Sequence, residues 1–137
     1  MTRQVVVTGM AGLSSIGLDW PMVFESLKAH RSAVQIMPDW KEIVGLRTHL
    51  AAPIEDFEVP KHYSKKSIRA MGRVSLLATR ASELALEDAG LLGTSHVTDG
   101  RMGVAYGSGT GSPTAHQVFF ENLHVHKRLK GISSTTY

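Results

Sequence analysis

The sequence contains no cysteine among its 137 residues. Disulfide bonds, zinc–thiolate sites and a cysteine nucleophile are therefore excluded within these residues. Long hydrophobic runs are missing too, since no apolar stretch approaches the ~18–20 residues that a membrane-spanning helix needs. The opening run, MTRQVVVTGM, lacks the apolar stretch and the small-residue cleavage site of a secretory signal. We therefore expect a cytoplasmic protein that does not enter a membrane.

Acidic residues are absent from one long stretch. No aspartate or glutamate lies between Glu58 and Glu83, although this stretch holds several cations. The composition, 42% hydrophobic and 20% charged, is that of a globular domain, and the formal net charge is only +3. A basic cluster is either a solvated helix face or a docking surface for nucleic acid or an acidic protein, and composition leaves both open. The two basic clusters comprise Lys61, Lys65, Lys66, Arg69 and Arg73, and, near the end of the sequence, Lys127, Arg128 and Lys130.

Two short apolar runs that end in glycine have the character of buried strands. Residues 4–8 (QVVVT) precede Gly9, and residues 102–106 (MGVAY) precede Gly107. Helices are expected after each glycine loop, so the order predicts an α/β fold in which these two strands run parallel. The other expected segments are a helix capped by Asp19 with Pro21 in its first turn, an irregular stretch with a short strand over 31–60, a long helix over 64–89 stopped by Gly90, and a helix started by Ser112 and Pro113 that ends by Gly131.

The glycine loops invite a nucleotide-binding interpretation, but their spacing does not support it. Short-chain dehydrogenases need T-G-x-x-x-G-x-G, and Leu13 occupies a glycine position, while the loop 107–111 (GSGTG) lacks the lysine of a Walker loop. The nucleophile elbow G-x-S-x-G is absent because Tyr106 replaces its first glycine. His124 and His126 would point about 200° apart on a helix. No catalytic constellation and no metal ligand set can be assembled from these residues, and nucleotide binding is the disfavoured interpretation of the glycine loops.

Four local strings, in order, cover essentially the whole chain. They are Arg3 to Gly17 (R-x-V-V-V-T-G and a small-residue loop), Ala29 to Ser32 (A-x-R-S), Ala85 to Leu91 (A-L-E-D-A-G-L) and Arg101 to Gly111 (R-x-G-V-x-x-G-S-G-x-G). In this order and spacing the sequence resembles the N-terminal portion of β-ketoacyl-acyl carrier protein synthases, condensing enzymes of the thiolase fold. The resemblance implies the N-terminal half of a layered αβαβα fold, with a mostly parallel sheet flanked by helices.

The same resemblance implies an acyltransferase. The family joins an acyl thioester to malonyl-acyl carrier protein with loss of carbon dioxide, in fatty-acid, polyketide or aryl-polyene biosynthesis. A cysteine takes the acyl chain and two histidines assist decarboxylation, and in the family all three follow the Gly-Ser-Gly block. We therefore interpret residues 1–137 as an incomplete ketoacyl-synthase domain, inactive alone, with no catalytic residue and no cofactor. Two alternatives stay open: a non-catalytic chain-length-factor-like partner subunit, and, less favoured, an NAD(P)-binding dehydrogenase-like domain.

The family's binding positions map to one loop and two basic segments. Its acyl pocket is lined near the Gly-Ser-Gly block, which implies Gly109 and Thr110 here, and the hydroxyl at 110 departs from the apolar residue of many relatives. The family meets its acidic carrier protein through basic residues before the long helix, so the resemblance implies that partner rather than nucleic acid, and a homodimer or a heterodimer with a related subunit. The family string R-x-M-D-R-F lacks its acid and its aromatic at residues 69–74, which resembles synthases of aryl-polyene pathways. The implied docking residues are Lys65, Lys66, Arg69, Lys127, Arg128 and Lys130.

Overall fold

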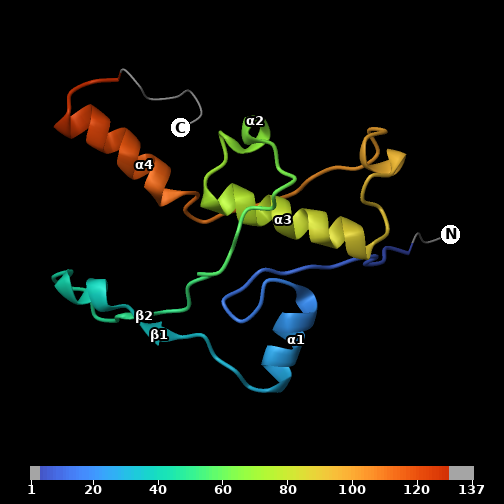
Figure 1. Cartoon of the computed structure of the whole chain (residues 1–137), viewed down its shortest axis with the longest axis horizontal. Helices are drawn as coiled ribbons and strands as arrows, with labels where there is room; N and C mark the ends of the chain where they lie inside the picture. Colours follow the sequence, from blue (N-terminus) through green and yellow to red (C-terminus); the bar gives the residue numbers. More distant parts are fainter. Residues whose placement is uncertain (1–3, 130–137) are drawn as a thin grey trace. The chain divides into compact units, whose positions relative to one another are not determined.

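The computed structural model describes residues 4–129 (Figure 1). These residues form helices joined by long irregular segments and one very short sheet. No helix in this part of the chain is long and apolar enough to cross a membrane. The elements are α1 (Trp20–Lys28), β1 (Gln35–Ile36), the 3-10 helix η1 (Pro38–Glu42), β2 (Leu50–Ala51), α2 (Lys65–Ile68), α3 (Arg73–Asp88), the 3-10 helix η2 (Ser95–Val97), α4 (Pro113–Phe120) and the π-helical turn η3 (Glu121–Val125).

The chain divides into two compact units, each of which takes part of α3. The first unit comprises Met1–Glu58 and Leu84–Gly90, and the second comprises Val59–Glu83 and Leu91–Tyr137.

In the first unit, α1 begins where the sequence predicts. Asp19 is extended, with φ −147° and ψ 169°, and its carboxylate accepts a hydrogen bond from the Met22 amide at 2.8 Å. Such a cap satisfies one of the amides that a helix start leaves without a partner. The helix buries Val23 and Ser26, and Val23 is the one buried hydrophobic side chain among the residues that the structure describes.

Two glycines of the predicted loop 9–17 are required because the backbone comes very close to a helix. A Cβ atom on Gly17 would lie 2.6 Å from the Val23 amide nitrogen, and one on Gly9 would lie 2.5 Å from the Ala85 carbonyl oxygen. The Gly9 contact is completed by a hydrogen bond of 2.9 Å from the Met10 amide to Asp88 Oδ2. The N-terminal loop therefore lies directly on the last turns of α3.

The stretch predicted to be irregular, residues 31–60, contains the only sheet among the described residues. Strands β1 and β2 pair antiparallel, with Gln35 opposite Ala51 and Ile36 opposite Leu50. Two residues a side is short even for an edge hairpin. The prediction of a short strand within this stretch is confirmed.

In the second unit, the predicted helix over 64–89 is two helices. Ser64 caps α2 by accepting the Ser67 amide at 3.1 Å, and α3 begins only at Arg73. Glycine is unfavourable inside a helix, and at Gly72 the Ser112 side chain occupies the place where a Cβ atom would lie. The prediction of one continuous helix is therefore wrong at this point. The predicted left-handed stop is confirmed, since Gly90 has φ +66°.

The last helix starts at Ser112 and Pro113 as predicted. It changes at Phe120 from α-helix to the π-helical turn η3, which ends at Val125. The predicted end by Gly131 lies outside the described residues.

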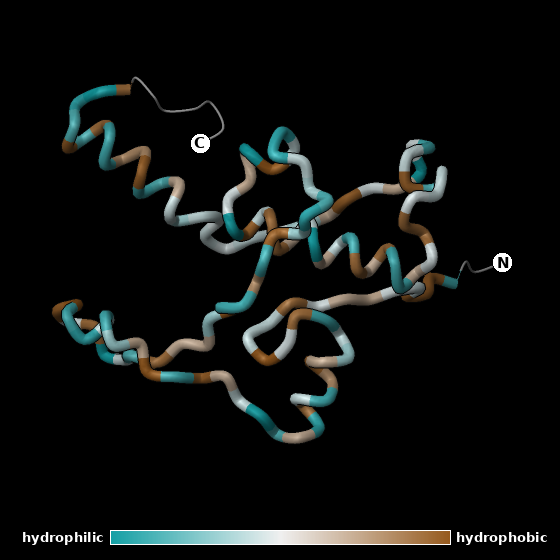
Figure 2. Tube along the Cα trace, viewed as in Figure 1, coloured by the Kyte–Doolittle hydropathy of each residue, from teal (hydrophilic) through white to brown (hydrophobic). Residues whose placement is uncertain are grey.

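The two predicted parallel strands are wrong as assigned, because neither segment forms a strand. Residues 4–8 and 102–106 have no regular secondary structure, and Val5 and Val104 are 95% and 91% exposed. A β-strand exists only where a neighbouring strand completes its hydrogen-bond ladder, and neither segment has such a neighbour among the described residues. Figure 2 shows apolar positions along these irregular segments as well as along the helices.

The contact of Gly9 with α3 gives a direct test of the first unit. Gly9→Ala should lower the free energy of unfolding by about 1–3 kcal/mol, because the added methyl group has to displace helix backbone. Gly12→Ala is the matched control, since a Cβ atom at Gly12 meets nothing within 4 Å. Urea denaturation should show Gly12→Ala within roughly 0.5 kcal/mol of the parent; equal effects of the two substitutions would contradict the close contact.

Candidate functional site

The site residues predicted from the sequence lie in two basic segments and one glycine-rich loop. The sequence has no cysteine, and residues 4–129 contain no group of three or more metal-binding side chains. The candidate site is therefore built from the predicted docking and pocket residues.

The first predicted basic segment forms the short helix α2. Lys65 and Lys66 lie in this helix and Arg69 is its C-terminal cap. All three side chains are exposed, and none has an ion-pair partner among the described residues. Cations without an internal carboxylate partner keep their charge available for an acidic partner. The structure thus brings three of the predicted docking residues onto one four-residue helix and its cap.

The segment that enters α2 is bound to a carboxylate on α3, a contact that the sequence does not predict. Tyr63 Oη donates to Glu83 Oε2 at 2.8 Å, and His62 Nε2 donates to Glu83 Oε1 at 2.6 Å. Arg80 Nη1 donates to the Tyr63-bonded oxygen at 2.6 Å. Both carboxylate oxygens of Glu83 are therefore used, and the two residues directly before the α2 cap are tied to α3. No local pattern reveals this contact, because its partners lie about 20 residues apart.

These contacts change the pKa values of two groups. Burial, then the hydrogen bond to Glu83 and its negative charge, raise the pKa of Tyr63 from 10.0 to about 12, against the opposing charge of Arg80. Burial alone would raise the pKa of Glu83, but the hydrogen bonds from Arg80, Tyr63 and His62 outweigh it and lower that pKa. Glu83 is therefore an anion held in place by three donors.

The second predicted basic segment follows η3. Lys127 and Arg128 are exposed, Lys127 has a left-handed φ of +51°, and the Arg128 amide donates to the Asn122 carbonyl at 3.1 Å. Lys130 lies outside the described residues. No hydrogen bond or ion pair joins this segment to α2 within the described part of the chain. The structure therefore does not unite the two predicted halves of the docking surface.

The predicted pocket residues lie in an exposed loop. Gly109 and Thr110 are both exposed, and the loop is closed by a hydrogen bond of 3.0 Å from the Gly111 amide to Ser108 Oγ. Gly111 has φ +65°, which favours glycine at that position. Neither Gly109 nor Thr110 lines the hollow that the first unit forms.

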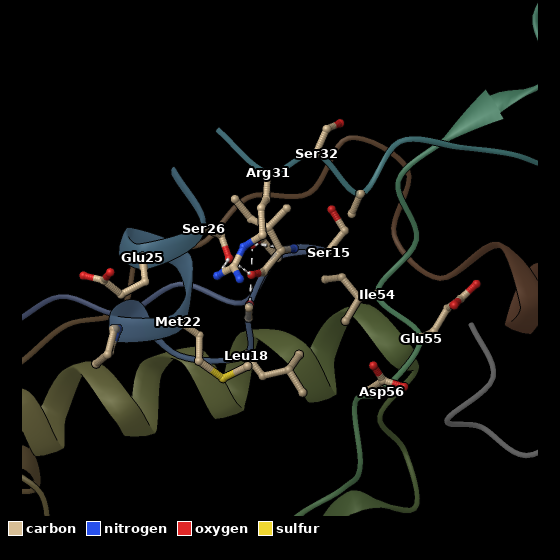
Figure 3. A pocket seen from close by; sticks show the side chains of 15 residues that line it. Ser15, Leu18, Met22, Glu25, Ser26, Arg31, Ser32, Ile54, Glu55 and Asp56 are labelled. Carbon is tan, nitrogen blue, oxygen red and sulfur yellow. Dashed lines mark hydrogen bonds between the residues drawn. The ribbon is translucent and has the colours of Figure 1, made fainter. Parts of the chain in front are cut away.

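That hollow, of about 700 Å³, lies between the loop 14–18, α1 and the segments 31–33 and 54–56 (Figure 3). Ser26 is one of the residues that line this hollow. Its buried hydroxyl donates to the Ile16 carbonyl at 2.8 Å and accepts from Arg31 Nη2 at 3.0 Å. Arg31 belongs to the A-x-R-S string and Ile16 to the Arg3–Gly17 string. The Ser26 hydroxyl therefore joins these two strings by hydrogen bonds. The role of Ser26 cannot be predicted from the sequence, because a lone serine within a helix carries no signal.

The Tyr63 hydrogen bond predicts a specific loss of stability at alkaline pH. Because the pKa of Tyr63 is 10.0 ordinarily and about 12 in the folded chain, the unfolded chain loses this proton first. The free energy of unfolding should therefore fall as pH rises through this interval. Tyr63→Phe should remove that component in urea titrations across it, whereas Tyr106→Phe, at a tyrosine that is 62% exposed, should keep the parent's slope. Parallel slopes for parent and Tyr63→Phe would refute the bond.

Comparison with known proteins identifies the fold and the family. A β-ketoacyl synthase from Burkholderia phymatum STM815 superposes with a TM-score of 0.85 and 45% identity over 96% of this chain and 32% of that one. The ishigamide ketosynthase/chain length factor gives a TM-score of 0.68 at 24% identity, over 96% of this chain and 32% of that one, which is a likeness of fold alone. The fold is thus the thiolase-like α/β fold that the resemblance implies.

The sequence matches extend over nearly the whole chain. A 3-oxoacyl-[acyl-carrier-protein] synthase 1 from Haemophilus influenzae is 36% identical over 110 residues, which are 80% of this chain and 26% of that protein. The chain spans about a quarter to a third of the length of its first curated relatives, 26% and 33%. The family model described as the N-terminal domain of β-ketoacyl synthase matches residues 2–136. The chain therefore belongs to the β-ketoacyl synthase family, and its residues correspond to the family's N-terminal domain.

Proposed function

We propose that this chain serves as the N-terminal domain of a β-ketoacyl-acyl carrier protein synthase, a transferase that lengthens acyl thioesters. The observation that carries the proposal is the family match over residues 2–136, and the relatives are named as 3-oxoacyl-[acyl-carrier-protein] synthases. In that function the domain contributes a docking surface for carrier protein and part of the acyl pocket. The nucleophile comes from polypeptide other than these 137 residues, which contain no cysteine.

The docking role is assigned to Lys65, Lys66 and Arg69 of the α2 segment, with Lys127, Arg128 and Lys130 as a second contact region. Acyl carrier proteins are acidic, and the α2 cations are exposed without ion-pair partners among the described residues. Each exposed charge pair contributes only ~0.2–1 kcal/mol. Their combined field acts mainly on the rate of encounter and on the choice of partner.

The pocket role is assigned to Gly109 and Thr110. Glycine lets a ligand approach the backbone closely, and the Ser108–Gly111 hydrogen bond holds the loop in a defined turn. A hydroxyl at 110 adds a polar group to a wall that meets an acyl chain. The substrates we propose are acyl and malonyl thioesters, with their chain length set partly at this position.

The alternative is a chain-length-factor-like partner subunit that keeps the fold without the nucleophile. The likeness to the ishigamide ketosynthase/chain length factor is compatible with it, although at 24% identity it bears on the fold only. A cysteine in the protein's remaining sequence at the family's nucleophile position would favour the synthase, and another residue there would favour the partner subunit. The dimeric assembly, the cytoplasmic location and the aryl-polyene subgroup stay predictions.

Charge reversal tests the docking surface. Lys66→Glu together with Arg69→Glu should weaken binding to an acidic acyl carrier protein roughly tenfold at low salt, and less at high salt, because screening weakens both attraction and repulsion. The control is Lys41→Glu at an exposed lysine of η1. Calorimetric or interferometric titration gives the Kd values; unchanged affinity in the double variant would remove α2 from the docking surface.

Enlarging the pocket residue tests the acyl-chain assignment. In the intact protein, Thr110→Phe should shift the products towards shorter acyl chains, because the added volume fills space along the chain. Chromatographic analysis of the acyl products measures this distribution. An unaltered product distribution, with activity retained, would mean that residue 110 does not line the acyl pocket.

A further inference from the structure

The basic helix α2 is too short and too exposed to be stable by itself. It is only four residues long, and isolated helices below ~12–15 residues are marginal in water. Its residues are exposed except Ile68, which is half-buried. Its orientation therefore depends on the segments that enter and leave it.

The entering segment is held by Glu83. His62 and Tyr63 immediately precede the Ser64 cap, and both donate hydrogen bonds to the two oxygens of that carboxylate. Their rings also meet edge to face, with centroids 4.7 Å apart and an interplanar angle of 85°. The Glu83 side chain is only 16% exposed, and hydrogen bonds to a charged acceptor are about twice as strong as neutral ones.

We propose that Glu83 is a positioning residue of the docking surface: by holding His62 and Tyr63 on α3, it fixes the direction in which Lys65, Lys66 and Arg69 face an acidic partner. Glu83 does not touch the partner in this role. The inference rests on the proposed docking function of α2 and adds to it the element that orients the cations.

This role makes a prediction opposite to the one that charge alone makes. Glu83 is an anion close to a basic helix, so its neutralisation makes the local potential more positive. If only net charge mattered, Glu83→Gln would strengthen the binding of an acidic protein. If Glu83 positions α2, the same substitution weakens binding, because the amide cannot accept all three donors and the segment entering α2 loses its attachment to α3.

The experiment compares Glu83→Gln with Glu87→Gln in the full chain, using a purified acidic acyl carrier protein as the probe. Glu87 lies one turn further along α3 and is exposed, so its substitution removes the same charge without touching the Glu83 contacts. We expect Glu83→Gln to raise Kd by about three- to tenfold and Glu87→Gln to leave it unchanged or slightly lower. The dependence of Kd on salt should also be shallower for Glu83→Gln, because fewer cations engage together.

A second variant separates positioning from a general loss of folding. Tyr63→Phe removes one of the three donors with no change of charge, and it should raise Kd in the same direction by a smaller factor while circular dichroism stays that of the parent. Equal or tighter binding by Glu83→Gln and Tyr63→Phe, with Lys66→Glu/Arg69→Glu still weakened, would overturn the positioning role and leave the docking surface intact. Unchanged binding in Lys66→Glu/Arg69→Glu would instead overturn the docking function itself.

Discussion

Carboxylates of helix α3 accept hydrogen bonds from loop segments, one in each compact unit. Near its end, Asp88 accepts the Met10 amide and Ala85 leaves room only for glycine at position 9. In its middle, Glu83 accepts Tyr63, His62 and Arg80. The contacts at Asp88 and Glu83 satisfy polar groups of the loops with carboxylates of the helix, and hydrogen bonds to an ionised acceptor are stronger than neutral ones. A loop attached at such a point acquires a definite conformation without a large hydrophobic core.

Tertiary contacts explain the need for particular residues in two of the sequence strings. Gly9 and Gly17 have no space for a side chain, and the arginine of the A-x-R-S string binds the buried Ser26 hydroxyl. Gly72, which stands where the family string has an acid, leaves room for the Ser112 side chain. A side chain at position 72 would have to displace the Ser112 side chain.

The glycine-ended apolar segments show the opposite situation, since their conformation depends on partners. Val5 and Val104 are almost completely exposed, although full burial of one such side chain contributes about 1.5–3 kcal/mol. Residues 4–8 and 102–106 have the composition of buried strands, yet they gain that stabilisation only when neighbouring strands pair with them. Within the described residues the sheet is limited to the β1–β2 hairpin.

The sequence by itself determined the features that depend on a few neighbouring residues: the Asp19 cap, the Gly90 stop, the Ser112–Pro113 helix start and the family strings. These are local because one side chain, or one φ angle, decides each of them. Only the tertiary structure decided the break before α3, the missing strand pairing and the Glu83 contacts with His62 and Tyr63. At the break, Gly72 lies against the Ser112 side chain, 40 residues away in the sequence. A strand ladder depends on partner strands, and the Glu83 contacts join side chains about 20 residues apart. The basic character of the proposed docking surface is therefore visible in the sequence, whereas the attachment of its entering segment to α3 appears only in the tertiary structure.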